Sequence, residues 1–444
     1  MRSVLHLAPL IVPVTLGLAG CRLSYELLGG TDGSFGGAGP GPSSVGGTSA
    51  GSGSGLGGAD DPGDGGTGGD SETGGSASTG GAGAGGAASA GGGSGASTGG
   101  ASTGGASSGG ASSGGSGGSL PIDLPITTTA DEDDSGATVG SPGQTGLSLR
   151  EAVTLANSTP GAQTIALDSA TYALAAVLPV ITEGLTLSGG NAILDFTAAP
   201  TATPCLQTNT SDVSIQDVEI SNCKGEAIYM GGSGATGLEV RRSTFHDNGS
   251  GVTAYGTGTL IEGNLITGSG TSGLAIYGSD AQIRDNEIFD SGTHGIYLGG
   301  AADGVVLIGN LLVRSNIGIS FGGLSGASVW FNTVDASAGF GISVGLANTI
   351  DFRNNVVTGS GTWGLNATDA RFAVITHNLL FGNVSGGCNS CTPGAPYLTT
   401  DPLYANPGAD DYSLGVGSPA IDAGVDVGEV YGGTAPDLGY LQAN

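Results

Sequence analysis

The 444-residue sequence has few aromatic residues, few basic residues and few cysteines. Aromatics make up 5% of the chain while Gly contributes 92 residues, so much of it lacks the side chains needed for a core. Lys and Arg total 10 against 38 Asp and Glu, a formal net charge of −28. This balance argues against nucleic acid as a partner and against electrostatic docking on anionic lipid. It suits an exported protein, with no cofactor expected except that calcium stays open.

No segment after the N-terminus is apolar enough to span a bilayer. Residues 1–20 have the composition of a secretion signal, with Arg2 ahead of a short apolar run. Leu18-Ala19-Gly20-Cys21 resembles the bacterial lipobox, which implies cleavage before Cys21, lipidation of its thiol and a membrane-anchored segment over residues 21–28. By the same resemblance Arg22 favours the outer membrane. An ordinary signal peptide with a chance cysteine is the alternative.

Residues 29–119 consist of Gly, Ser, Ala and Thr with a few acids, in near-repeats such as STGGAST. Such a segment cannot bury enough apolar surface to fold, so we expect it to be disordered. A random coil of this length would extend roughly 50 Å between its ends. This predicts a tether that holds a folded domain away from a membrane, and a low-complexity insert without that role is the alternative.

The rest of the chain is dominated by a repeat of 22 to 24 residues. Each unit has an asparagine between apolar residues, as in IEGNLI and IRDNEI, and a Gly followed by Leu or Ile keeps the same period. The asparagines are Asn264, Asn286, Asn310, Asn332, Asn355 and Asn378, and the glycines are Gly273, Gly295, Gly318, Gly341 and Gly364. Two features that share one period indicate a solenoid.

Short alternating runs within each unit, such as Ile296-Tyr297-Leu298, predict strands. Units of this length have no room for a crossover helix, so the strands must stack in parallel, by default with a right-handed path. Adjacent rungs then lie roughly 4.8 Å apart, and equivalent residues form columns. We expect the asparagines to form a ladder in which each amide donates to one rung and accepts from another. The sequence predicts an all-β fold, a right-handed parallel β-helix with its regular repeats over residues 205–386.

This region resembles the β-helix repeats of the pectin lyase-like superfamily. The superfamily includes polysaccharide lyases, hydrolases and epimerases, and also adhesins and surface proteins, so the resemblance implies the fold and leaves the function open. Its galacturonase signatures NTD, GHG and RIK are absent, and Thr293-His294-Gly295 comes nearest to the second.

Residues 120–204 contain the sequence LSLREAVTLANS, which resembles the CSLREAI domain found ahead of bacterial β-helices, with Leu147 in place of the family's Cys. Apolar residues at helical spacing, Ser148 as N-cap and Glu151 three positions later predict a short helix that closes the open end of the solenoid. We expect Arg150 and Glu151 to be surface and capping residues rather than catalytic ones. Strands beginning at Thr164, Thr171 and Leu185 would form the first, irregular rungs.

Residues 387–444 resemble the choice-of-anchor Q domain that ends many such chains, notably in Asp401-Pro402-Leu403 and in GSPAID from Gly417. We expect its aspartates to be turn residues, and calcium binding is the alternative. The four cysteines after Cys21 predict two disulfides in an oxidising compartment, Cys205 with Cys223 and Cys388 with Cys391. The alternative is a zinc site in which all four cysteines are ligands.

Three columns of the repeat carry candidate site residues. Arg241, Glu262 and Arg284 face outward on consecutive rungs, so the arginines form a candidate uronate-binding pair, with an exposed salt-bridge stack as the alternative. Asp247 and Asp290 lie two rungs apart, roughly 10 Å, with His294 nearby. They are candidate catalytic residues, although both aspartates occur in turn sequences.

The third column is aromatic. It predicts that Tyr229, Tyr255, Tyr277 and Tyr297 fall at outward strand positions on successive rungs, where sugar rings would stack; tyrosines selected for strand propensity are the alternative. The favoured function is therefore an outer-membrane lipoprotein, displayed at the surface or in the periplasm, that binds carbohydrate or a partner. A polysaccharide lyase or glycoside hydrolase acting on an acidic glycan is the second hypothesis, and a structural spacer is the third.

Overall fold

The computed structural model describes residues 122–143, 145–232, 234–300, 302–345, 349–367 and 372–440. The predicted signal segment 1–20, Cys21, the anchored segment 21–28 and the linker 29–119 lie outside these residues. No helix in the described part of the chain is long and apolar enough to cross a membrane.

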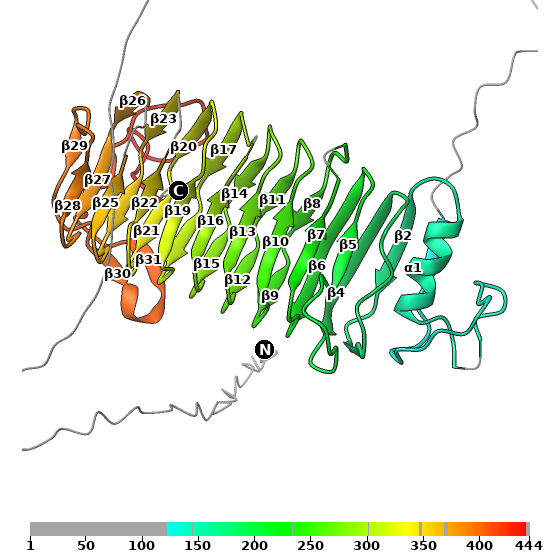
Figure 1. Cartoon of the computed structure of the whole chain (residues 1–444). Helices are drawn as coiled ribbons and strands as arrows, with labels where there is room; N and C mark the ends of the chain where they lie inside the picture. The colour runs from blue at the N-terminus through cyan, green and yellow to red at the C-terminus, as the bar shows by residue number, and fades with distance from the viewer. Residues whose placement is uncertain are drawn as a thin grey trace, which may run out of the picture. The chain divides into compact units, whose positions relative to one another are not determined.

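The described residues form a coil of short strands whose parallel ladders build a 20-stranded and a nine-stranded sheet (Figure 1). Because only β4 and β6 run through both halves of the 20-stranded sheet, we describe these halves as the first and second sheets and the nine strands as the third. The first sheet contains β1 (Ile122–Pro125), β2 (Gln163–Leu167), the first halves of β4 (Leu185–Asp195) and β6 (Val213–Ser221), β8 (Glu239–Arg241), β11 (Leu260–Glu262), β14 (Gln282–Arg284), β17 (Val305–Ile308), β20 (Ala327–Trp330), β23 (Ile350–Arg353) and β26 (Phe372–Thr376). The second sheet contains β3 (Thr171–Ala173), the second halves of β4 and β6, β9 (Thr244–His246), β12 (Leu265–Thr267), β15 (Glu287–Phe289), β18 (Leu311–Val313), β21 (Thr333–Asp335), β24 (Val356–Thr358), β27 (Asn378–Phe381) and β29 (Tyr397–Leu398).

The third sheet has nine strands and carries the tyrosines. It contains β5 (Leu206–Thr208), β7 (Glu226–Met230), β10 (Ser250–Ala254), β13 (Ser272–Ile276), β16 (His294–Leu298), β19 (Ile317–Phe321), β22 (Ile342–Val344), β25 (Trp363–Asn366) and β28 (Gly386–Asn389). Inward side chains of all three sheets form one buried column of Ile, Leu and Val. The predicted first strands are present as β2, β3 and β4.

The asparagine ladder is present at the turn between the first and second sheets. The amide of Asn286 donates to Asn310 Oδ1 at 2.9 Å, and that of Asn310 donates to Asn332 Oδ1 at 2.9 Å. Each amide also donates to a backbone carbonyl of the preceding coil, as Asn310 Nδ2 does to Ile283 O at 2.8 Å. The ladder residues are at most 2% exposed, so their amides satisfy the backbone of a turn that water does not reach.

The glycine period has a steric cause in the third sheet. A Cβ added at Gly295 would lie 2.6 Å from Leu312 Cδ2 and 2.7 Å from the carbonyl oxygen of Gly318 in the next coil. Gly273 is similarly placed, 2.6 Å from Ile288 Cγ2. Real Cβ atoms do not approach this closely, so each coil needs Gly where its backbone passes the core side chain of the following coil.

Helix α1 (Leu149–Ser158) covers the N-terminal end of the coil, as predicted (Figure 1). Ser148 Oγ accepts from Glu151 N at 3.2 Å, and Glu151 Oε2 accepts from Ser148 N at 2.8 Å, which completes the predicted capping box. The apolar face of the helix and Leu147 are buried in the core. The hydrophobic side chain of Leu147 therefore fills the position at which the CSLREAI sequence has Cys.

Arg150 is not the surface residue that its helical position predicts. Its side chain is 13% exposed and forms a two-pronged ion pair with Asp131, with Nε–Oδ1 at 2.8 Å and Nη2–Oδ2 at 3.0 Å. It also donates to the carbonyls of Ala176 and Val177 at 2.9 and 2.7 Å. The prediction was wrong because the segments that bury Arg150 lie far from it in sequence.

Both predicted disulfides are present, Cys205–Cys223 and Cys388–Cys391, with Cα atoms 6.0 and 5.6 Å apart. All four thiols are thus consumed, which removes the alternative zinc site.

The C-terminal region folds back along the second sheet. It contains β30 (Tyr404–Asn406), a 3-10 helix (Pro407–Ala409) and β31 (Asp411–Leu414), with β30 and β31 antiparallel. Tyr412 packs against Phe289 and Leu311, while Leu438 packs against strands further along the same sheet. The second sheet is therefore covered from β15 onward.

Candidate glycan-binding face

The four tyrosines lie on the third sheet, but only two of them lie within strands. Tyr229 belongs to β7 and Tyr297 to β16, whereas Tyr255 and Tyr277 are the first residues after β10 and β13. The residue that aligns with Tyr229 in β10 is Thr253. The prediction of four strand positions was therefore wrong for Tyr255 and Tyr277. Tyr255 and Tyr277 each lie two residues beyond the position that aligns with Tyr229. Because successive side chains of an extended chain point to opposite faces, a displacement of two residues keeps them on the same face of the sheet.

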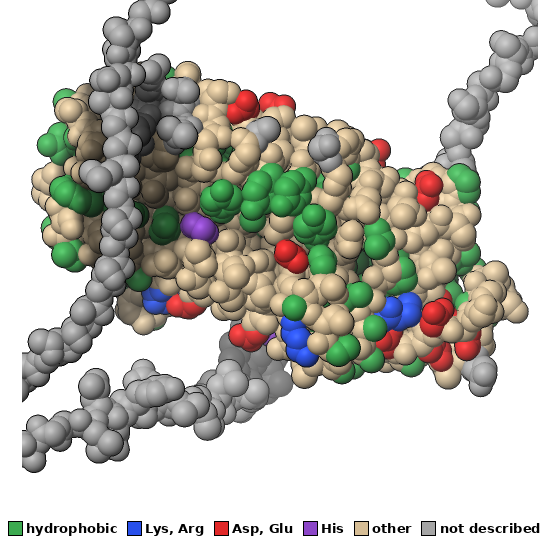
Figure 2. All heavy atoms as spheres, viewed as in Figure 1, with side chains coloured by type: hydrophobic (Ala, Val, Ile, Leu, Met, Phe, Trp, Pro, Cys, Tyr) green, Lys and Arg blue, Asp and Glu red, His purple; other side chains and the backbone are tan. Residues whose placement is uncertain are grey.

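The tyrosine rings nevertheless form one continuous row, which we call the tyrosine row. The centroids of Tyr255 and Tyr277 are 4.4 Å apart and their planes differ by 4°, so these rings are stacked. Tyr229 and Tyr297 extend the row at 5.8 and 5.7 Å in tilted and edge-on contacts. Figure 2 shows the resulting band of apolar side chains across the face that carries the third sheet.

A second row, which sequence reasoning missed, continues the aromatic surface toward β25. The pairing of β16 with β19 aligns His294 with Ile317. The next two coils add Phe340 and Trp363 to this row. Their carbonyls accept backbone hydrogen bonds from Gly318 N and Gly341 N of the preceding coils. All four side chains are partly exposed. The sequence contains a pattern that could have predicted this row, because each of these residues directly precedes one of the periodic glycines.

His294 links the two rows. Its ring centroid is 5.1 Å from that of Tyr297, and its Nδ1 is 3.4 Å from Ser272 Oγ. Burial lowers the pKa of His294, so the imidazole is neutral at pH 7. Burial likewise raises the pKa of Tyr229 and Tyr277, which keeps their hydroxyls protonated. The face is thus aromatic and polar, and Glu226 of β7 is the charged group that acts on Tyr229 and Tyr277.

The predicted arginine column is present, on the first sheet. Glu262 aligns with Arg241 on one side and Arg284 on the other. Arg241 Nε is 3.7 Å from a Glu262 carboxylate oxygen, and Arg284 is 3.5 Å from Glu429 of the C-terminal region. The structure does not bring these arginines together with the tyrosine row, and both already have carboxylate partners.

Asp247 and Asp290 follow β9 and β15, which are separated by β12, so they lie two rungs apart as predicted. Both have positive φ, 56° and 55°, which identifies them as left-handed turn residues. Asp290 accepts two bonds from Arg314, at 2.8 and 3.0 Å, and Asp247 Oδ2 is 3.0 Å from His246 Nδ1.

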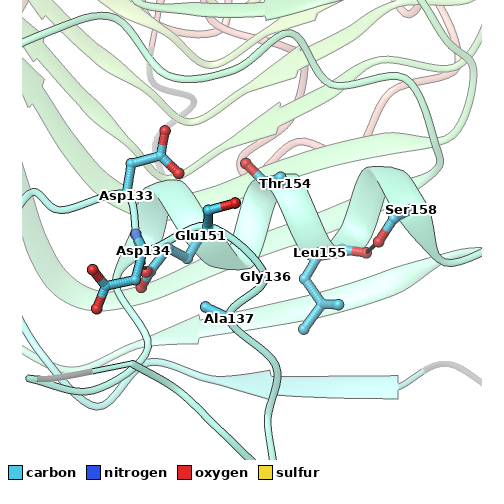
Figure 3. A pocket seen from close by; sticks show the side chains of 9 residues that line it. Asp133, Asp134, Gly136, Ala137, Glu151, Thr154, Leu155 and Ser158 are labelled. Carbon is cyan, nitrogen blue, oxygen red and sulfur yellow. Dashed lines mark hydrogen bonds between the residues drawn. The ribbon is translucent and has the colours of Figure 1, made fainter.

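The pocket drawn in Figure 3 lies beside α1, away from these candidates, and has a volume of about 330 Å³. Glu151 borders it, but both oxygens of this carboxylate accept backbone hydrogen bonds, from Asp134 N at 2.7 Å and from Ser148 N. Across the described ranges, no three His, Cys, Asp or Glu side chains are grouped so that they could hold a metal ion.

Comparison with known proteins agrees with this architecture. Residues 185–266 and 250–397 match the family model described as "Right handed beta helix region". The described part of the chain is a right-handed parallel β-helix. Among solved structures, pectate lyase Pel9A is 13% identical with a TM-score of 0.51, over 74% of this β-helix chain and 98% of its own. The periplasmic alginate epimerase AlgG is 15% identical with a TM-score of 0.41, over 54% and 68% of the two chains. No curated protein matches the sequence. At 13% identity the likeness to pectate lyase Pel9A shows the fold of the β-helix and leaves its chemistry open.

Proposed function

We propose that this β-helix binds carbohydrate through the tyrosine row on its third sheet. The observation that carries the proposal is the continuous row of four rings on one face of a chain with 5% aromatic residues. Tyr255 and Tyr277 cover one face of each other, so a glycan contacts the row through its ring edges, its hydroxyls and its uncovered faces. A row of such rings along the solenoid axis matches an extended chain of sugars. The fold shared with a pectate lyase is consistent with a saccharide ligand.

Binding is favoured over cleavage by the surroundings of His294. The acid of the same column, Glu226, is three strands away, with Ser250 and Ser272 between them. Among the candidate acids, Asp290 is engaged by Arg314 and shapes a turn. General acid–base cleavage needs a pair of ionisable groups on either side of one bond, and no such pair is assembled by the described residues of this face.

Replacing Tyr255, Tyr277 and Tyr297 together by Ala should abolish retention on a glycan that the wild type binds. Each ring contributes stacking of about 1 kcal/mol, so the loss should reach about 100-fold in affinity. Affinity electrophoresis in glycan-containing gels would measure it. Tyr397→Ala is the matched control, because Tyr397 is 44% exposed on β29 of the second sheet.

Besides a wild type that binds no glycan, two outcomes would contradict the proposal. One is equal retention of wild type and triple variant, provided that both melt at similar temperatures. The other is glycan cleavage that Asp247→Asn with Asp290→Asn eliminates, which would establish the lyase or hydrolase hypothesis instead. A wild type that binds no glycan would favour the structural spacer.

We also propose that the β-helix is an outer-membrane lipoprotein anchored through Cys21. The sequence Leu18-Ala19-Gly20-Cys21 and the long Gly/Ser linker after it support this proposal. Mass spectrometry of the mature protein should find residues 1–20 removed and Cys21 carrying acyl chains. Cys21→Ser should release the protein from the membrane fraction, and a wild type with an unmodified Cys21 would refute the anchor.

A further inference from the structure

The third sheet differs from the rest of the molecule in its charge. Its nine strands contain no Lys or Arg, and Glu226 is their one acidic residue. From β19 to β25 the residues in line with Tyr297 carry hydroxyls or an amide, namely Ser320, Ser343 and Asn366. Such groups both donate and accept hydrogen bonds, as sugar hydroxyls do.

The described arginines lie on other surfaces, where carboxylates already neutralise them. The pairs are Arg150–Asp131, Arg241–Glu262, Arg242–Asp217, Arg284–Glu429, Arg314–Asp290 and Arg353–Asp351. In Figure 2 the Lys and Arg side chains in view lie along the lower margin of the face and not in the aromatic band. Lys224, in the turn before β7, is the one described lysine, and it stands two residues from Glu226.

Acids border the face on both sides. Asp280 and Asp303 lie in the turns that follow β13 and β16, and Asp247 lies in the turn that leads into β10. Together with the net charge of −28, they give the approach to the tyrosine row a negative potential.

We infer that the tyrosine row is selective for an uncharged glycan. A polyuronate carries a carboxylate on every sugar, and holding it requires cations placed along the chain. The described residues of this face offer one lysine at its edge and carboxylates around it, so a polyuronate is repelled where a neutral glycan can stack and hydrogen-bond. The inference rests on the proposed function and adds the class of ligand.

The test compares the full-length wild type on neutral and acidic polymers of similar length. The gels would contain laminarin, xyloglucan or galactomannan on one side and polygalacturonate or alginate on the other, at low and high sodium chloride. We expect retention on at least one neutral glycan to exceed retention on either acidic polymer by at least about tenfold, and to be unchanged by salt, because no ion pair contributes. Retention should be lost in the triple tyrosine variant and kept in Tyr397→Ala.

The outcomes separate the two claims. Tyrosine-dependent retention on polygalacturonate or alginate, with none on the neutral glycans, would overturn the inference and leave the proposed function standing. Retention on no polymer, or retention that survives the triple variant, would overturn the proposed function and the inference with it. Retention on a neutral glycan that falls steeply as salt rises would also overturn the inference, because it would show that ion pairs hold the ligand.

Discussion

Arg150→Met is expected to destabilise the β-helix by about 3–5 kcal/mol, because it removes one partner of a buried ion pair. Asp131 is 8% exposed, and without Arg150 it would keep only the backbone bond from Ala175 N at 2.7 Å. The carbonyls of Ala176 and Val177 would lose their donor as well. Urea unfolding of the full chain, followed by circular dichroism, would measure the change.

Arg242→Met is the matched control for this prediction. Arg242 forms the same two-pronged pair with Asp217, but its side chain is 54% exposed, so its loss should cost about 0–1 kcal/mol. Similar losses in the two variants would show that burial does not determine the strength of the Arg150 pair. Asp131→Asn should reproduce part of the effect, because the amide keeps the shape and not the charge.

Asn310→Ala is expected to destabilise the β-helix by about 2–4 kcal/mol, because it strands several buried groups at once. Asn286 loses the acceptor of both its side-chain amide, at 2.9 Å, and its backbone N–H, at 3.1 Å. Ile283 O and Asn332 Oδ1 lose a donor. A single orphaned group costs about 1–3 kcal/mol, and water has no path into the turn to replace the amide.

Asn316→Ala provides the control for the ladder, because Asn316 is exposed in the turn that follows β18 of the same coil. We expect it to change the free energy of unfolding by less than about 0.5 kcal/mol. A melting curve for Asn310→Ala that coincides with both the wild type and Asn316→Ala would contradict the role of the ladder. Asn286→Ala should behave like Asn310→Ala, since the two positions have equivalent bonds.

The Asn and Gly columns could be predicted from the sequence because stacking imposes the same requirement on every coil. Each turn must satisfy the same backbone groups, and each coil must leave space for the next one, so the same residues recur at one period. The capping box of α1 could be predicted for a different reason. Its two hydrogen bonds join Ser148 and Glu151, residues three positions apart, so the local sequence contains the whole interaction.

The tyrosine row could be predicted only in part. Its side of the molecule follows from the repeat, but its two-residue stagger depends on where each strand ends, and the variable turns determine that. The row through Phe340 and Trp363 was not predicted, because the repeat was defined by its glycines and the residues that precede those glycines were not compared between units.

What the sequence by itself determined is therefore the repeating part of this protein, namely its parallel strands, its amide ladder, its glycine column and its N-terminal cap. The tertiary structure alone decided which distant residues pair and which surface stays open. Arg284 meets Glu429 and Tyr440 meets Glu287 across more than 140 residues of chain, and Tyr412 covers the second sheet. A short-range pattern cannot encode such contacts, because they depend on where the C-terminal region folds back onto the coil. That placement covers much of the second sheet and leaves the tyrosine row on the third sheet uncovered, with Tyr255 39% exposed and the other three tyrosines partly exposed.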